Sequence, residues 1–253
     1  MRKIVSYTIL NNEEDIIESF VRYNFVYIDK MIIIDNGCTD HTIDILKLLI
    51  KEGYDIEIFD ESLVDFEQFG IMNKYLQKIA NEYDSDIVIP LDSDEFLMCD
   101  SKRVRDVLEK MSLDKVYLVQ WQNFVLRKED DEKEMFICRK IKYSYLHRDY
   151  KVIIPTRLIT KDMILRTGQH DILAEKIERV LLPELKLAHF SYRSIEQAKT
   201  KTMCHSIKYI NYLNRQDAEG MHRNVFASHC IQSNDESWFF DTFNERIKRL
   251  KIK

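Results

Sequence analysis

Three carboxylates within four positions are the residues best suited to chemistry. Asp92, Asp94 and Glu95 directly follow the apolar run 87–91, whose β-branched residues and lack of a polar face are typical of a strand buried on both sides. In an open α/β sheet, ligands bind outside the carboxyl ends of the strands. Carboxylates crowded there repel one another, and their oxygens suit Mg²⁺ or Mn²⁺. The sequence therefore predicts a divalent-metal site at this point.

The Asp-x-Asp tripeptide at 92–94 has a second copy at 84–86, but the two differ in position. Asp84 and Asp86 lie before the same strand, where a polar turn is expected. An acidic loop that caps the next helix remains an alternative for residues 92–95. A calcium-binding EF-hand loop is excluded, since Leu97 and Arg103 stand where Gly and Glu are needed. An aspartyl-phosphate hydrolase would place its triplet after the first strand, whereas this one follows the fourth.

The first hundred residues alternate strands with helices. We expect strands over 3–10, 31–35, 56–60 and 87–91, and helices after residue 12, over about 43–53 and over 66–83. Short connections between them predict a parallel sheet with right-handed crossovers. Asn12 is a candidate N-cap for the first helix. Because parallel strands end at one edge, the polar residues that follow them should converge there: Asn11, Asn12, Asp35, Asp60, Asp92 and Asp94.

The alternation fades after about residue 100. We expect a helix over 103–111, a strand over 116–121, a charged loop over 128–134, irregular β structure over 136–160, a polar turn over 166–171, a strand over 185–190, and helices over 194–214 and 235–253. Pro155 favours an edge strand or a turn, and Ser194 is a candidate N-cap for the helix that follows it.

Composition indicates a globular cytoplasmic protein. The 253 residues, 45% hydrophobic and 32% charged, suffice for one large α/β domain with an appendage. No run approaches the ~20 apolar residues of a membrane span, and the N-terminal residues lack a signal-peptide core. Five cysteines without a Cys-x-x-Cys pair indicate reduced thiols. With five glycines and no glycine-rich phosphate loop, a bound nucleotide would be held by a metal and side chains.

The charge is unevenly distributed along the chain. Residues 186–253 hold 12 Lys and Arg against 7 Asp and Glu, although the whole chain has a formal net charge of −5. This basic region is either a solvated helix or a peripheral contact to an anionic lipid surface or a phosphate-bearing substrate. The acidic remainder argues against nucleic acid as a partner. The oligomeric state is left open.

Several segments resemble the family 2 glycosyltransferases, in particular a bacterial branch with an Asp-x-Asp-Glu-Phe motif. In chain order they are Asn12-Glu13, Ile-Asp-Asn-Gly-Cys-Thr-Asp at 34–40, Leu-Asp-Ser-Asp-Glu-Phe at 91–96, Trp-Gln-Asn-Phe at 121–124 and His-Phe-Ser-Tyr-Arg-Ser at 189–194. Together they span about residues 3–200. The chain departs from the family at Cys38, where Ser is usual, and at His170-Asp171, where His-Glu is frequent.

The resemblance implies a GT-A fold, which is a Rossmann-like, mostly parallel sheet flanked by helices, here with an irregular β segment and a helical C-terminal region. The expected glycosyltransferase domain covers 1–190, with a nucleotide-binding part over about 1–100 and an acceptor-side part over about 101–190, and 191–253 form an extension. The expected reaction is inverting transfer from a nucleotide sugar (a UDP-sugar first, a GDP-sugar second) to a glycan or lipid-linked acceptor. Mn²⁺ or Mg²⁺ would assist it, and the product would be a bacterial surface polysaccharide.

The resemblance also assigns roles to residues. Asp92, Asp94 and the late His189 would hold the metal. The donor would contact Asn11, Asn12, Glu13, Asp35, Asn73, Asp92 and Ser93. Each has a structural alternative: Asp35 could cap a helix, His189 could be a hydrogen-bonded surface residue, and Asn73 could lie on a neutral helix surface. Trp121 is either a core residue or an acceptor wall.

The catalytic base is either Asp171, beside His170, or Glu95. A metal lowers the pKa of a carboxyl group close to it and so weakens it as a base, which favours Asp171. Two other functions remain open. The same acidic edge could serve a nucleotidyl or phosphoryl transferase, or the chain could be a non-catalytic nucleotide-sugar-binding subunit of a larger synthase.

Overall fold

The computed structural model describes residues 1–62, 68–130, 133–134, 137–174 and 176–201. The expected helix over 235–253, most of the helix over 194–214 and most of the basic C-terminal region lie outside these residues. Where the 194–214 helix begins, Ser194 Oγ accepts a hydrogen bond from the amide of Gln197 at 3.0 Å, which confirms the predicted N-cap.

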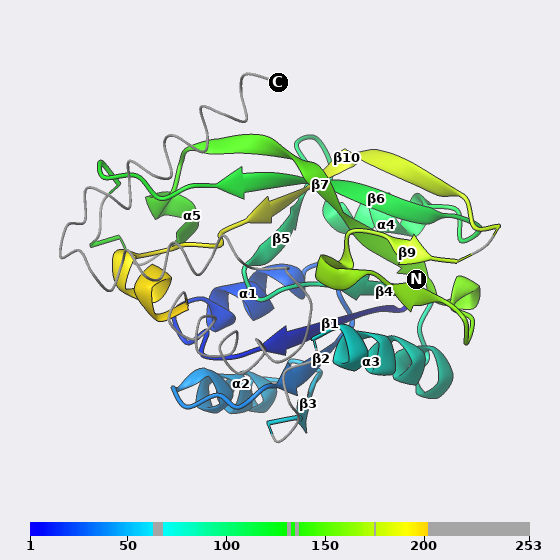
Figure 1. The fold of residues 1–253 in the computed structure, drawn as a ribbon, viewed down its shortest axis with the longest axis horizontal. Coiled ribbons are helices and arrows are strands. Elements are labelled where there is room, and N and C mark those ends of the chain that lie inside the picture. Colours follow the sequence, from blue (N-terminus) through cyan, green and yellow to red (C-terminus); the bar gives the residue numbers. More distant parts are fainter. Residues whose placement is uncertain (63–67, 131–132, 135–136, 175, 202–253) are drawn as a thin grey trace, which may run out of the picture. The chain divides into compact units, whose positions relative to one another are not determined.

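An eight-stranded sheet with the order β3-β2-β1-β4-β7-β6-β10-β5 is the centre of the fold (Figure 1). Its strands are β1 (Ile4–Leu10), β2 (Lys30–Asp35), β3 (Ile56–Asp60), β4 (Ile87–Pro90), β5 (Glu95–Met98), β6 (Val116–Phe124), β7 (Ser144–Pro155) and β10 (Arg179–His189). A separate two-stranded ribbon consists of β8 (Ile164–Leu165) and β9 (Ile172–Leu173). The four strands predicted in the first hundred residues are therefore confirmed.

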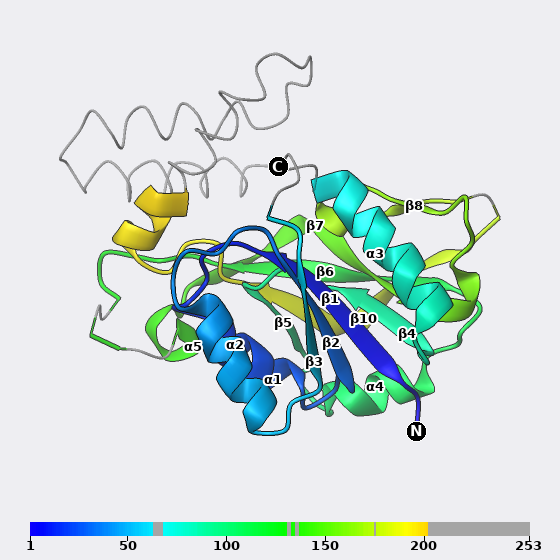
Figure 2. The same cartoon turned by 90° about the horizontal axis from the view of Figure 1, so that it is seen from below.

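Helices cover both faces of the sheet. They are α1 (Ile17–Asn24), α2 (Thr42–Lys51), α3 (Gln68–Glu82) and α4 (Val104–Lys110), with α5 (Ile137–Lys140) and the 3₁₀ turns η1 (Thr156–Leu158) and η2 (Thr167–Gln169) in later segments. Strands β1, β2, β3 and β4 are parallel. The connections through α1 and α2 run from β1 to β2 and on to β3. The connection through α3 runs in the opposite direction along the sheet, from β3 to β4 on the other side of β1. Right-handed crossovers therefore place α1 and α2 on one face and α3 on the other (Figure 2).

The main core lies between α3 and the sheet. Apolar residues at positions 71, 72, 75, 76 and 79 follow the helical period and form one buried face. This face packs against Val5 and Tyr7 of β1, Val88 of β4, and Val152 and Ile154 of β7. Because β4 leads directly into the acidic motif, this packing also holds the strand end that carries the motif's carboxylates.

One expectation about the later strands was wrong, and one alternative for the acidic motif is excluded. The segment expected to be irregular contains β7, a 12-residue strand between β4 and β6 rather than at an edge. Pro155 is its last residue, opposite Ile87, and η1 follows, so the predicted turn is present. The acidic motif also does not cap a helix, because Glu95 begins β5, which pairs antiparallel with β10 and places Glu95 opposite His189.

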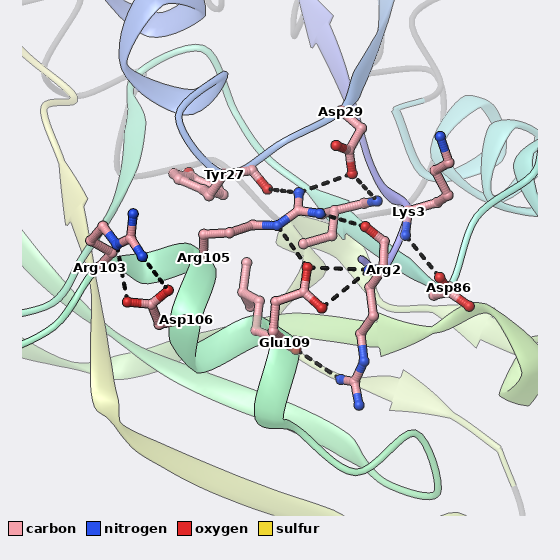
Figure 3. A network of polar contacts seen from close by, with 11 residues as sticks. Arg2, Lys3, Tyr27, Asp29, Asp86, Arg103, Arg105, Asp106 and Glu109 are labelled. Atoms are coloured by element: carbon pink, nitrogen blue, oxygen red, sulfur yellow. Dashed lines mark hydrogen bonds and ion pairs between the residues drawn. The ribbon is translucent and has the colours of Figure 1, made fainter.

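A polar network joins α4 to the amino-terminal end of β1 (Figure 3). The guanidinium of Arg105 donates to the carbonyl of Tyr27 at 3.0 Å, to Asp29 at 2.9 Å and to Glu109 at 3.0 Å. Glu109 also accepts the amide of Arg2 through both carboxylate oxygens. Since this network lies at the strand end that is remote from the acidic motif, we interpret it as structural.

The chain divides into two compact units, one made of Met1–Asn123 and Tyr145–His189, the other of Phe124–Ser144 and the segment from Phe190. All residues of the site described below belong to the first unit. The predicted boundary at residue 190 stays a prediction. In the described part of the chain, no helix is both long and apolar enough to cross a membrane.

Candidate active site

The loops after β1 and β2 are tied together by the asparagines predicted to contact the donor. The Asn11 amide donates to the carbonyls of Asn36 and Gly37 at 2.8 and 2.9 Å. Asn12 has a φ of +58° and its side-chain oxygen accepts the amide of Thr39 at 2.7 Å. Asn12 is not the helix cap that was predicted, because α1 begins at Ile17, five residues later. Its side chain instead links the two loops.

Asp35 and Glu13 lie at, or just after, the carboxyl ends of the same two strands. Asp35 is the last residue of β2, and its carboxylate accepts the amide of Cys38 at 2.8 Å. The amide of Glu13 donates to Thr42 Oγ1 at 2.8 Å. The register pairs Asp35 with Asp60 of β3 and with Leu10 of β1. The polar strand ends therefore converge at one edge, as the sequence predicts.

The carboxylates of the acidic motif have very different surroundings. Asp92 is partly exposed, whereas Ser93, Asp94 and Glu95 are buried, at 4, 3 and 0%. Glu95 Oε2 accepts the amide of Asp92 at 2.9 Å, which folds the motif into a tight turn. Complete burial raises the pKa of Glu95 well above its usual value, although Lys151 opposes the shift. Of the three carboxylates, Asp94 and Glu95 are therefore buried, and Asp92 is partly open to solvent.

Asp94 and His189, two of the predicted metal ligands, lie close together. Asp94 Oδ1 is 3.6 Å from His189 Nε2, and the β5–β10 pairing positions both residues. His189 Nδ1 lies 2.8 Å from Asn123 Oδ1. Since an amide oxygen only accepts, Nδ1 donates to Asn123, and Nε2 is the ring nitrogen on the side of Asp94. Asn123 had no predicted role, but it orients the imidazole as metal-site histidines usually require.

These donors fit a divalent cation such as Mn²⁺. A carboxylate oxygen and a neutral imidazole nitrogen are both suitable ligands. No group of three or more His, Cys, Asp or Glu that could hold a metal occurs among the described residues. Cations at phosphate-binding sites commonly use one or two protein carboxylates together with substrate phosphates. The pair therefore fits an ion that is completed by a phosphate-bearing ligand.

Lys151 of β7 lies at the centre of the site, and sequence reasoning missed it. Its side chain is 1% exposed, and Nζ lies 3.0 Å from Asp92 Oδ2 and 2.8 Å from Glu95 Oε2. Gln169 Oε1 accepts a third hydrogen bond at 2.6 Å. A signal was present in the sequence, since Lys151 directly precedes the apolar run 152–154 and would lie beside buried residues if that run were a central strand.

Three histidines surround Trp121 of β6. The ring centroids of His189, His170 and His147 lie 4.5, 4.8 and 6.1 Å from that of the indole. His170 Nδ1 lies 2.8 Å from the carbonyl of Tyr150, so this nitrogen also carries a proton. The predicted base region around His170 and the predicted metal ligand His189 thus contact one aromatic ring.

Asp171 and Asn73 are placed by the β8–β9 ribbon. Asp171 Oδ1 accepts Arg179 Nε and the amide of Ile172, both at 2.8 Å, and its side chain is 37% exposed. Within the described residues, Oδ2 has no hydrogen-bond partner. Asn73 Nδ2 donates to the backbone carbonyl of Leu165 at 3.0 Å, and Asn73 Oδ1 accepts the backbone N–H of Leu165 at 2.7 Å. Asn73 thus anchors β8 to α3.

The sheet order and the flanking helices define the GT-A fold of nucleotide-sugar glycosyltransferases. The structure resembles a mannosyltransferase from Pyrobaculum calidifontis in complex with GDP-Man and Mn²⁺, with a TM-score of 0.50 and 11% identity, over 95% of this chain and 72% of that chain. It also resembles GalNAc-T7 with UDP, GalNAc and Mn²⁺, with a TM-score of 0.50 and 10% identity. That match covers 77% of this chain and 45% of GalNAc-T7. The predicted fold class is confirmed.

No protein-family model matches the sequence, and no curated protein matches it.

Proposed function

We propose that this chain is a metal-dependent, inverting glycosyltransferase. It transfers a sugar from a nucleotide-sugar donor to a glycan or lipid-linked acceptor in the synthesis of a bacterial surface polysaccharide. The observation that carries the proposal is the Asp94–His189 pair, at 3.6 Å, at the acidic strand end of a GT-A sheet. The two similar enzymes named above were each solved with Mn²⁺ and a nucleotide ligand, which supports the same ligand classes here.

On the donor side, Asp94 and His189 would hold the cation, and the bound cation would stabilise the negative charge of the departing nucleoside diphosphate as a Lewis acid. Asp92 serves the ribose. Its Oδ2 is taken by Lys151, while Oδ1 has no hydrogen-bond partner among the described residues and the side chain is 30% exposed. Asp35, at the adjoining strand end, contacts the base or ribose from a loop that Asn11 and Asn12 hold in place.

On the acceptor side, Asp171 is the base. Glu95 is fully buried, and Oε2 already accepts from Lys151 and from the amide of Asp92, so an acceptor hydroxyl has no access to it. Asp171 is partly exposed and keeps Oδ2 available, while Arg179 fixes the position of Oδ1. The acceptor oxygen would lose its proton to Asp171 as it attacks the anomeric carbon. The leaving phosphate takes the electron pair of the broken bond. Because the attack comes from the face opposite the leaving group, this single displacement inverts the anomeric carbon.

The first experiment measures the rise in melting temperature that UDP or GDP produces with Mn²⁺. A nucleotide at 100 times its Kd stabilises by about 2.7 kcal/mol, which is roughly 5–10 °C for a chain of this size. Asp94→Asn should abolish the Mn²⁺-dependent part, whereas the matched control Asp84→Asn, an exposed aspartate before β4, should keep it. Equal losses in both variants would contradict the assignment of the metal site.

The second experiment incubates the protein with labelled nucleotide sugars and Mn²⁺. Sugar transfer, or slow release of free sugar from the donor, supports the proposal, whereas transfer of a nucleotide or binding without turnover contradicts it. With an active donor, Asp171→Asn should reduce turnover by about 10²–10⁴-fold, with donor affinity nearly unchanged. Near-wild-type turnover of Asp171→Asn would remove Asp171 from this role.

A further inference from the structure

Lys151 is a buried cation whose hydrogen-bonding capacity is fully used by the protein. An ammonium group has three N–H donors, and Nζ has three acceptors: Asp92 Oδ2 at 3.0 Å, Glu95 Oε2 at 2.8 Å and Gln169 Oε1 at 2.6 Å. The side chain is 1% exposed. Lys151 therefore has no donor left for a substrate phosphate, and any role in the reaction must act through these three neighbours.

The ammonium group is kept charged by its surroundings. Burial by itself would lower the pKa of Lys151, but the carboxylates of Asp92 and Glu95 outweigh this effect and raise it above the usual value. A charged group in this position is costly to desolvate, and an apolar side chain of similar size often stabilises a fold as well or better. What an apolar side chain cannot do is bind three polar groups from different segments in one geometry.

Two of the three neighbours flank the proposed metal ligand Asp94 in sequence. Asp92 comes from the turn after β4, and Glu95 is the first residue of β5. With both flanking side chains bound to one ammonium, the turn between them has a single arrangement, in which Asp94 lies 3.6 Å from His189. Lys151 also occupies one oxygen of Asp92 and one of Glu95.

The third neighbour belongs to the turn that carries the proposed base. Gln169 has a φ of +57° and follows Gly168 at +74°, a left-handed pair that a non-glycine residue rarely adopts. Its side chain is 1% exposed and accepts from Lys151. The next residue, His170, packs against Trp121, and Asp171 follows it. Lys151 thus connects the β4–β5 turn directly to the turn at 167–171.

We propose that Lys151 is a positioning residue that couples the two halves of the site, because it holds the turn bearing Asp94 and the turn bearing His170 and Asp171 in one arrangement. The roles of those residues rest on the proposed function. The coupling itself rests only on the three contacts of Nζ, and it can be measured without any sugar transfer.

The test compares Lys151→Met with Lys30→Met by hydrogen exchange and by Mn²⁺ binding. Lys30 is a suitable control because it also pairs with two carboxylates, Asp55 at 2.8 Å and Glu57 at 3.6 Å, at the start of β2. Lys151→Met should speed amide exchange in both 90–98 and 164–173. It should also weaken Mn²⁺ binding in the presence of UDP or GDP by about 10- to 100-fold, as loss of a residue that supports metal ligands does. Lys30→Met should change neither.

A double variant separates positioning from simple charge balance. Lys151→Met combined with Glu95→Gln removes both buried charges, so it should recover most of the lost melting temperature. Amide exchange in 164–173 should stay fast and Mn²⁺ binding should stay weak, because Asp92 and Gln169 still lack their hydrogen bonds to Lys151. If the double variant recovers wild-type exchange and Mn²⁺ affinity, Lys151 is only a counter-ion and the proposal is overturned.

Gln169→Leu provides a variant that leaves the ion pairs intact, in case Lys151→Met does not fold. It should speed exchange in 164–173 only, and exchange unchanged there would also overturn the coupling. A wild-type protein that transfers no sugar would instead refute the proposed function, while the exchange measurements would still decide the role of Lys151.

Discussion

Replacing Gly168 with alanine should displace His170 from the site. A Cβ atom on Gly168 would lie 2.5 Å from His170 Nε2 and 2.8 Å from Cδ2, which is closer than carbon atoms approach one another without repulsion. The ring has to move aside, yet its Nδ1 is bound to the carbonyl of Tyr150 and the ring packs against Trp121 in a T-shaped contact. Gly168→Ala must therefore break these contacts.

The expected cost has two parts. The backbone at Gly168 has a φ of +74°, and an alanine in this region costs about 1–2 kcal/mol. Displacing His170 loses a hydrogen bond worth about 1 kcal/mol and an aromatic contact worth about 0.5–1.5 kcal/mol. The sum is about 2.5–4.5 kcal/mol of unfolding free energy. At 2–4 °C per kcal/mol, this lowers the melting temperature by roughly 5–18 °C.

Gly53→Ala is the matched control for the backbone part. Gly53 has a φ of +104°, and a Cβ atom added there would have no other atom within 4 Å. We therefore expect Gly53→Ala to lose only the roughly 1–2 kcal/mol of backbone strain. Thermal unfolding of both variants gives the difference directly, and Gly168→Ala should melt about 3–10 °C lower than Gly53→Ala.

A double-mutant cycle isolates the clash with the imidazole. In a His170→Ala background there is no ring to displace, so Gly168→Ala should then cost no more than Gly53→Ala does. Equal costs of Gly168→Ala with and without His170 would exclude the imidazole as their cause, because the strain would then be unrelated to this contact.

Two further predictions concern stability and the β8–β9 ribbon. Asn73→Leu should speed amide exchange at Leu165, whose N–H and carbonyl it binds, and a large loss of nucleotide affinity without this change would restore Asn73 as a donor contact. Glu109 has a lowered pKa, first because it accepts the amide of Arg2 and also because Arg105 is near. Its contribution to stability is therefore present above the unfolded-state pKa of about 4.3 and is lost as the pH falls through the lower folded-state pKa. The melting temperatures of the wild type and Glu109→Gln should differ at pH 6, and the gap should narrow as the pH falls below about 4.3. A constant gap would exclude this linkage.

Local sequence patterns were enough to predict the parallel half of the sheet and the place of the acidic motif. Strand and helix periods are readable within about ten residues, so Ile56–Asp60 was predicted with its observed bounds and the other early strands within about one residue. The convergence of Asp35 with its neighbours followed from parallel pairing alone, because such strands end at one edge.

The contacts of the motif's carboxylates, in contrast, depend on segments that are distant in the sequence. Lys151 meets Asp92 across 59 positions of sequence, and this contact exists because β7 inserts beside β4 instead of lying at an edge. The pairing of Glu95 with His189 likewise depends on β5 joining β10. Local spacing does not encode the order of strands in a sheet. Which carboxylate is buried against an ammonium, and which one faces an imidazole, therefore depends on long-range packing.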